Sequence, residues 1–144
     1  MEARTHRVAA AAYIFFGGKL LLLRRTLPPH TLVPPGGRLE VDEDPVAGMR
    51  REVREETGLE VRLIGVAHTW FGRITEQAEP LIAINYLAAA GSSDIRLSDE
   101  HSEYLWVTRE EIAAGKIQTT DDKGRGYQPK DILDAFDRYN RLTK

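Results

Sequence analysis

The chain has 144 residues, with 20 Lys and Arg against 22 Asp and Glu, and its formal charge at pH 7 is −2. It contains no Cys, which excludes a disulfide scaffold, a thiolate zinc site, a Cys-bound iron–sulfur cluster and a Cys nucleophile. The length predicts a single domain over residues 1–144, and the nearly balanced charge argues against a binder of nucleic acid or anionic membranes.

Two apolar runs near the N-terminus, residues 8–16 and 19–25, predict a β-hairpin, because the Gly-Gly pair between them readily adopts positive φ angles. Both runs are almost continuously apolar, which is typical of a sheet covered on both faces. The first run has the length of a signal-peptide core, but the turn and the second run favour the hairpin. Neither run approaches the ~18 apolar residues of a membrane helix, so we expect a soluble, cytoplasmic protein without a membrane partner.

The next segment, residues 26–37, holds four of the seven prolines and predicts a loop with a restricted backbone. A short strand is predicted over residues 38–41. A helix is predicted over residues 44–57, because acidic residues before it offer N-cap chemistry, a proline suits its first turn, and Gly58 is placed to end it.

The second half of the chain predicts further strands over residues 59–71, 80–90 and 104–107, which are rich in aliphatic and aromatic residues. A capped helical turn is expected after Thr108, and Pro129 opens a last helix with apolar residues at helical spacing. Strands interspersed with two substantial helices indicate an α/β or α+β domain with its sheet between helices. The polar stretches 91–94 and 118–126 are predicted to be mobile loops.

The helix predicted over residues 44–57 gathers three glutamates in one sector. On a wheel of 100° per residue, Glu52, Glu55 and Glu56 lie together beside the apolar stripe. Like charges at this spacing destabilise a helix, and Arg51 is one cation against three anions. A hard divalent cation such as Mg²⁺ is a fitting complement, because it prefers carboxylate and carbonyl oxygens. From the helix alone, a solvated face balanced by arginines is an equally good interpretation.

The sequence Pro-Pro-Gly-Gly at residues 34–37 favours the metal interpretation. It brings a stiff backbone, bare of side chains at its glycines, toward the helix, where carbonyl and phosphate oxygens can approach. Divalent ions on such a cluster would lower the pKa of bound water and hold the oxygens of a diphosphate. The residues therefore indicate metal-assisted hydrolysis of a phosphoanhydride.

Residues 37–59 read GRLEVDEDPVAGMRREVREETGL, and this segment resembles the Nudix box. The order of elements around it is similar to the Nudix-type α/β/α sandwich, an α/β fold with a mixed sheet between helices. The fixed positions of the box, all of which agree, are Gly37, Glu43, Arg51, Glu52, Val53, Glu55, Glu56, Gly58 and Leu59. Asp42 and Leu32 depart from the residues found in many members, which have Gly and Trp there.

The resemblance implies a hydrolase, dependent on Mg²⁺ or Mn²⁺, that cleaves the pyrophosphate linkage of a nucleoside diphosphate joined to another group. ADP-ribose, nucleotide sugars, dinucleoside polyphosphates and oxidised nucleoside triphosphates are the substrate classes it offers. Residues 67–78 carry neither the proline nor the tyrosine marker of two subtypes, so the substrate stays open. The resemblance also suggests a homodimer.

The resemblance implies roles for individual residues. The implied metal ligands are the carbonyl of Gly36 and the carboxylates of Glu52, Glu55 and Glu56. The candidate catalytic residues are Arg51, Glu52, Glu55, Glu100 and Glu103. Arg51 is expected to orient a box glutamate, and the general base is expected to be Glu52 or one of the loop acids Glu100 and Glu103.

Substrate contacts are predicted outside the box, since a nucleobase is bound by an aromatic plane and a diphosphate by arginines. The candidates are Arg24, Arg25, Trp70, Phe71 and Arg73. Two other functions are weighed. A prenyl-diphosphate isomerase on the same scaffold is disfavoured because such enzymes generally use a Cys, and a nucleotide-binding module without catalysis is disfavoured by the complete set of box acids.

Overall fold

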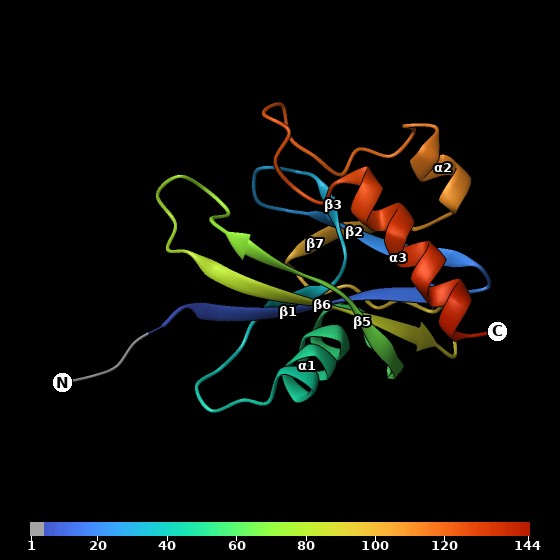
Figure 1. Ribbon diagram of the computed structural model, residues 1–144, viewed down its shortest axis with the longest axis horizontal. Coiled ribbons are helices and arrows are strands. Elements are labelled where there is room, and N and C mark those ends of the chain that lie inside the picture. Colours follow the sequence, from blue (N-terminus) through green and yellow to red (C-terminus); the bar gives the residue numbers. More distant parts are fainter. Residues whose placement is uncertain (1–4) are drawn as a thin grey trace.

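A computed structural model describes residues 5–144 and places a seven-stranded sheet between helices (Figure 1). Helix α1 (Pro45–Thr57) covers one face, while α2 (Arg109–Ala113) and α3 (Pro129–Leu142) cover the other (Figure 1). The strands are β1 (Arg7–Phe16), β2 (Lys19–Arg25), β3 (Leu32–Val33), β4 (Gly36–Arg38), β5 (Val61–Gly72), β6 (Leu81–Ala90) and β7 (His101–Val107). The predicted α/β sandwich with a mixed sheet is confirmed.

Strand β1 organises the sheet. It runs parallel to β6 along most of its length, pairs antiparallel with β4, and meets β2 only beside the Gly17–Gly18 turn. Beyond that turn β2 pairs with β3 and β7 instead, and β5 joins the other side of β6. Beyond the Gly17–Gly18 turn the sheet therefore divides into two halves. In one half β1 pairs with β4 and β6, and in the other β2 pairs with β3 and β7.

Both faces of the sheet are buried, as the continuous apolar runs predict. Tyr13 and Phe15 of β1 pack with Phe136 of α3 on one face, and Ile14 packs with Met49 and Val53 of α1 on the other. Complete burial of a large apolar side chain stabilises a fold by about 1.5–3 kcal/mol, so both helical layers are fixed firmly on the sheet.

Helix α1 begins and ends where its sequence predicts. The carboxylate of Asp44 accepts a hydrogen bond from the backbone N–H of Ala47 at 3.0 Å, Pro45 occupies the first turn, and Gly58 ends the helix with a φ of 77°. These residues supply the N-cap, the preset first turn and the left-handed C-cap that a helix needs. Helix α2 likewise has the capping box expected at Thr108.

The segment between β2 and α1 differs from the prediction. The expected loop over residues 26–37 contains β3 and the start of β4, and the strand expected over 38–41 is wrong because β4 ends at Arg38. Glycine causes the shift: a Cβ on Gly36 would lie 2.5 Å from the carbonyl oxygen of Ala10, so only glycine permits this pairing with β1. After β4 the chain turns through Asp42, whose φ is 62°.

The last predicted strand is longer than expected. The strand predicted over residues 104–107 begins earlier, at His101, because β7 pairs with β2 from Leu20 to Arg25. Among residues 5–144, no helix is both long and apolar enough to cross a membrane.

Candidate functional site

Glu56 is a buried acid with an unsatisfied oxygen. The residue is 2% exposed; its Oε1 accepts a hydrogen bond from the backbone N–H of Gly36 at 3.0 Å, and its Oε2 has no hydrogen-bond partner among residues 5–144. Burial, and after it the neighbouring carboxylate of Glu52, raise the pKa of Glu56 well above its ordinary value. A buried carboxylate oxygen without a partner is costly, so this position calls for a proton or a cation.

Arg51 holds the neighbouring acids of the box. Its Nε and Nη2 donate to the two carboxylate oxygens of Glu43 at 2.7 and 2.9 Å. Its Nη1 donates to Glu52 at 3.0 Å and to Glu55 at 3.2 Å. The hydrogen bonds from Arg51 lower the pKa of Glu43 to about 2, so this acid is ionised at neutral pH. The two-pronged contact fixes the guanidinium, which in turn orients two other glutamates.

Strand β4 brings its backbone close to these acids. A Cβ on Gly37 would lie 2.7 Å from the carboxylate carbon of Glu52, closer than real Cβ contacts allow. In the same strand, the backbone N–H of Gly36 donates to the carboxylate of Glu56. The two glycines therefore let one strand contact two carboxylates of α1.

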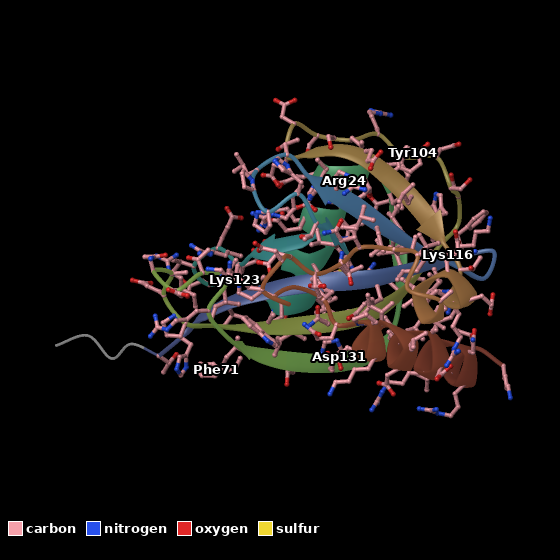
Figure 2. The ribbon with its side chains drawn as sticks, turned by 90° about the horizontal axis from the view of Figure 1, so that it is seen from above. Arg24, Phe71, Tyr104, Lys116, Lys123 and Asp131 are labelled. Carbon is pink, nitrogen blue, oxygen red and sulfur yellow. The ribbon has the colours of Figure 1, made fainter. Side chains whose placement is uncertain are left out.

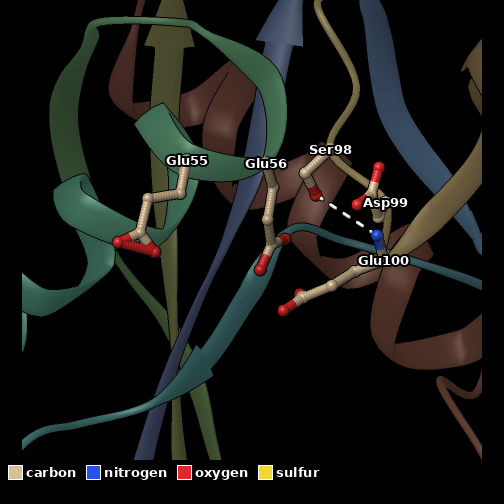
Figure 3. Close-up of a pocket in the computed structure, with 5 residues that line it drawn as sticks. All are labelled: Glu55, Glu56, Ser98, Asp99 and Glu100. Carbon is tan, nitrogen blue, oxygen red and sulfur yellow. Dashed lines mark hydrogen bonds between the residues drawn. The ribbon is translucent and has the colours of Figure 1, made fainter.

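A cleft of about 300 Å³ opens beside these acids, lined by Glu55, Glu56, Ser98, Asp99 and Glu100. Figure 3 shows the carboxylates of Glu56 and Glu100 turned toward each other, while the side chain of Glu55 points away from both. The cleft thus joins α1 to the loop before β7, two segments far apart in the sequence.

The donor set suits a hard divalent cation, since carboxylates are its preferred ligands and Oε2 of Glu56 has no hydrogen-bond partner within residues 5–144. No group of three or more acids or histidines within residues 5–144 is close enough to hold a metal ion as the side chains stand. The contact of Glu55 with Arg51 accounts for this, because it draws the third carboxylate away. The structure joins Gly36 to Glu56 through its N–H, and the role of its carbonyl stays a prediction.

Of the two loop acids predicted as bases, only Glu100 lines the cleft. Glu103 instead forms an ion pair with Arg24, whose guanidinium also donates to the carbonyl of His30 at 2.9 Å. Arg25 lies opposite His101 in the pairing of β2 with β7, and its Nε is buried without a hydrogen-bond partner among the described residues. Two predicted substrate contacts, Arg24 and Arg25, are therefore on β2 and outside the lining of the acidic cleft.

The other predicted contacts lie at the end of β5. The ring of Trp70 packs over Gly72, where a Cβ would lie 2.5 Å from it, and Phe71 is 62% exposed at the molecular edge (Figure 2). Arg73 donates to the carbonyl of Ala78 at 2.6 Å, which closes the β5–β6 loop. Arg73 also lines a second hollow, of about 320 Å³, whose other lining residues are Thr75, Glu76, Lys123 and Arg125.

Several of these residues were not predicted as site residues. Asp99 lies in the same acidic run as the predicted bases Glu100 and Glu103, and Ser98 precedes it where the chain turns. Lys123 and Arg125 lie in a stretch predicted only as a mobile loop. Asp121 orders that stretch, since its carboxylate accepts the backbone N–H groups of both cations at 2.9 Å.

Comparison with known proteins gives a family match over most of the chain. A family model described as "NUDIX domain" matches residues 5–126. A MutT-like protein of Streptomyces ambofaciens is 32% identical over 79 residues, which are 55% of this chain and 49% of that protein. The asymmetrical bis(5'-nucleosyl)-tetraphosphatase of Mus musculus is 33% identical over 86 residues, which are 57% of this chain and 58% of that enzyme. The chain thus spans about half the length of these curated relatives.

A solved structure matches along the whole chain. The crystal structure of a MutT protein from Methanosarcina mazei Go1 has a TM-score of 0.70 and 30% sequence identity, and the match covers 100% of this chain and 99% of that one. The fold therefore occurs in a related protein of almost the same extent.

Proposed function

This chain belongs to the Nudix family, and from that premise we propose that it is a metal-dependent hydrolase of a nucleoside diphosphate linked to another group. Water would attack one phosphorus of the pyrophosphate linkage, the bond from that phosphorus to the bridging oxygen would break, and two phosphate products would leave.

The unpartnered Oε2 of Glu56 is the observation that carries this proposal. It lies beside Glu52, at the wall of an acidic cleft. The residues that would hold Mg²⁺ or Mn²⁺ are Glu52, Glu55, Glu56 and the carbonyl of Gly36. When bound, the ion would polarise phosphate oxygens and lower the pKa of water. Glu55 is the most exposed of the three acids, with 57% of its side chain accessible, so it can rotate away from Arg51 at little cost.

We assign the general base to Glu100. Its carboxylate faces Glu56 across the cleft, where it can accept the proton of an attacking water molecule (Figure 3). Glu52 is the second candidate, but its carboxylate is engaged by Arg51. Glu103 is the weakest candidate, because Arg24 neutralises it outside the cleft lining.

The substrate is expected to carry several phosphates. Arg73, Lys123 and Arg125 line one hollow together with Glu76, and Arg125 also pairs with Asp121. The three cations outnumber these two acids, and such an excess favours phosphate oxygens. Trp70 offers an aromatic surface on the strand that leads to Arg73. One relative is named as a dinucleoside tetraphosphatase, which makes this substrate class the first to test among the four that the resemblance offers.

The other functions weighed from the sequence are less well supported. The isomerase has no Cys for proton transfer, and a module that only binds nucleotides has no need of an acid facing the cleft opposite α1. Assembly as a homodimer and location in the cytoplasm stay predictions from the sequence.

The test is a hydrolysis screen with Mg²⁺ and, separately, Mn²⁺ on ADP-ribose, a nucleotide sugar, a dinucleoside tetraphosphate and an oxidised nucleoside triphosphate. We expect turnover of at least one substrate and none after chelation of the metal. Nucleotide binding without product release with either metal would favour the binding module.

Glu100→Gln tests the base. Because general-base catalysis contributes about 10²–10⁴-fold, we expect kcat to fall by that factor with KM little changed. Glu103→Gln, three residues further along in β7, is the matched control. Its activity should stay within about twofold of the wild type, because a base outside the cleft contributes nothing to proton transfer. A large loss of kcat in Glu103→Gln with little loss in Glu100→Gln would assign the general base to Glu103 instead.

A further inference from the structure

Glu100 enters the cleft from a turn, directly before β7 begins at His101 (Figure 3). A side chain on a turn points where the backbone directs it, and displacement of a catalytic group by ~1 Å can cost about 10²-fold in rate. The groups that hold the backbone of Glu100 therefore decide whether its carboxylate faces Glu56.

Thr26, on the loop after β2, contacts this backbone at two adjacent carbonyls. Its N–H donates to the carbonyl oxygen of Glu100 at 3.1 Å. Its hydroxyl lies 3.0 Å from the same oxygen and 3.2 Å from the carbonyl oxygen of Asp99. A hydroxyl has one hydrogen to donate, so the two carbonyls share it or alternate. One residue thereby fixes the last two residues of the turn.

The strand register explains why Thr26 lies there. The pairing of β2 with β7 shifts between Arg24 and Arg25, so that Arg25 lies opposite His101. One residue further along, Thr26 lies opposite Glu100 and continues the ladder past the end of both strands. A register shift of this kind re-aims the strand that contains it.

The other contacts of the turn are longer. The N–H of Glu100 lies 3.4 Å from the hydroxyl of Ser98, and the N–H of His101 lies 3.4 Å from the carbonyl of Ser98. Both distances exceed the usual range for such hydrogen bonds, about 2.7–3.2 Å. Thr26 is also exposed, so its hydroxyl contributes little to folding, and its main effect is on the direction of the turn.

We infer that Thr26 is a positioning residue for Glu100, whose hydroxyl keeps the carboxylate of the general base directed at the cleft. The inference rests on the proposed function, in which Glu100 accepts the proton of water. Thr26 itself acts only through the backbone of the turn.

Thr26→Val tests the hydroxyl alone, because valine keeps the branched shape and the backbone N–H. With the most rapidly hydrolysed member of the four-substrate panel, we expect kcat to fall about 5- to 20-fold and KM to stay within about twofold. Thr26→Ser restores the hydroxyl and should restore kcat to within about threefold of the wild type.

Thr143→Val is the matched control. It removes a comparable hydroxyl–carbonyl hydrogen bond, of 2.7 Å to Tyr139, at the end of α3. Because both hydroxyls are exposed, both valine variants should change Tm by no more than about 2 °C, while only Thr26→Val loses activity.

The double variant decides the matter. In the Glu100→Gln background, adding Thr26→Val should leave kcat unchanged, since the carboxylate that Thr26 positions is gone. Multiplicative losses in the double variant, or equal activity of the Ser and Val variants, would overturn the inference. A wild type that hydrolyses no member of the panel would refute the proposed function rather than the role of Thr26 alone. A fully active Glu100→Gln would refute Glu100 as the general base. The inference about Thr26 depends on both and would be overturned in either case.

Discussion

Glu56 occupies a position where an acid costs stability. The residue is 2% exposed, one carboxylate oxygen lacks a hydrogen-bond partner among residues 5–144, and its pKa is raised, chiefly by burial. Apolar burial alone would place a hydrophobic side chain here, as it does at Val53 of the same helix. An acid kept at such a cost is typical of a functional site rather than of a stabilising contact.

Glu56→Gln is therefore expected to separate stability from activity. Without metal, its free energy of unfolding at neutral pH should equal the wild-type value or exceed it by about 1–3 kcal/mol, because the amide neither buries a charge nor has to take up a proton on folding. Its hydrolytic activity should fall at least about 10²-fold, because a metal ligand is lost. Urea unfolding and the substrate screen measure the two effects.

Glu60→Gln serves as the control for this variant. Glu60 lies beyond the end of α1, its side chain is 72% exposed, and it forms a surface ion pair with Arg54. The stability and activity of Glu60→Gln should therefore stay close to the wild type. A Glu56→Gln protein with wild-type turnover would remove Glu56 from the metal site.

Glu43 gives a prediction for the dependence of stability on pH. Its hydrogen bonds with Arg51 lower its pKa from 4.5 to about 2. A carboxyl whose pKa is lowered by folding stabilises the protein above its unfolded pKa and loses that contribution as the pH falls toward the folded pKa. Glu43→Gln should therefore lower Tm at pH 7, with a difference from the wild type that shrinks between about pH 4.5 and pH 2. Thermal unfolding across this range is the measurement, and a difference independent of pH would contradict the assignment.

At the scale of elements, β4 and α1 form one functional unit. The strand has three residues, yet it contacts β1 on one side and two carboxylates of the helix on the other. Its glycines carry no side chain that would hold it in place, so the pairing with β1 and the hydrogen bond to Glu56 fix its position. A side chain added to this strand should disturb the acids before it disturbs the fold.

Gly37→Ala tests this. The new Cβ would lie 2.7 Å from the carboxylate carbon of Glu52, which must move. Because overpacking costs typically about 1–3 kcal/mol and the carboxylate is a flexible end, we expect a loss near ~1 kcal/mol with at least a ~10-fold loss of activity. Gly91→Ala is the control, since a Cβ there meets nothing within 4 Å. Equal activity in the two variants would mean that the position of Glu52 is unimportant.

At the scale of the whole molecule, the cleft forms where the two halves of the sheet separate. Glu56 is tied to the half that carries β4, and Glu100 to the half that carries β7, through Thr26. The cleft therefore depends on the packing of α1 against the sheet and on the ladder between β2 and β7 together.

Metal binding should consequently stabilise the entire fold. A ligand that binds only the folded state at about 100 times its Kd adds about 2.7 kcal/mol to the free energy of unfolding. We expect Tm to rise with Mg²⁺ or Mn²⁺ concentration and to return on chelation, as followed by differential scanning fluorimetry. Glu56→Gln should lose this rise, whereas Glu60→Gln should keep it. A wild-type Tm that does not change with either metal argues against the site.

The sequence by itself determined the local structure and the family. The caps of α1, the Gly-Gly turn and the periodic apolar positions predict elements that the structure confirms, because capping and burial act within a few residues. The spacing of the acids within the box predicts a common sector on one helix, and the box lies within the residues that the family model matches.

Only the tertiary structure decided which acids meet. Glu100 and Glu103 are equally good candidates in the sequence. In the structure, the ladder between β2 and β7 pairs Glu103 with Arg24, whereas Glu100 lines the cleft. The strand β4 and the role of Thr26 were missed for the same reason. Both depend on backbone hydrogen bonds between segments distant in the chain, and such bonds leave no periodic pattern in the residues that form them.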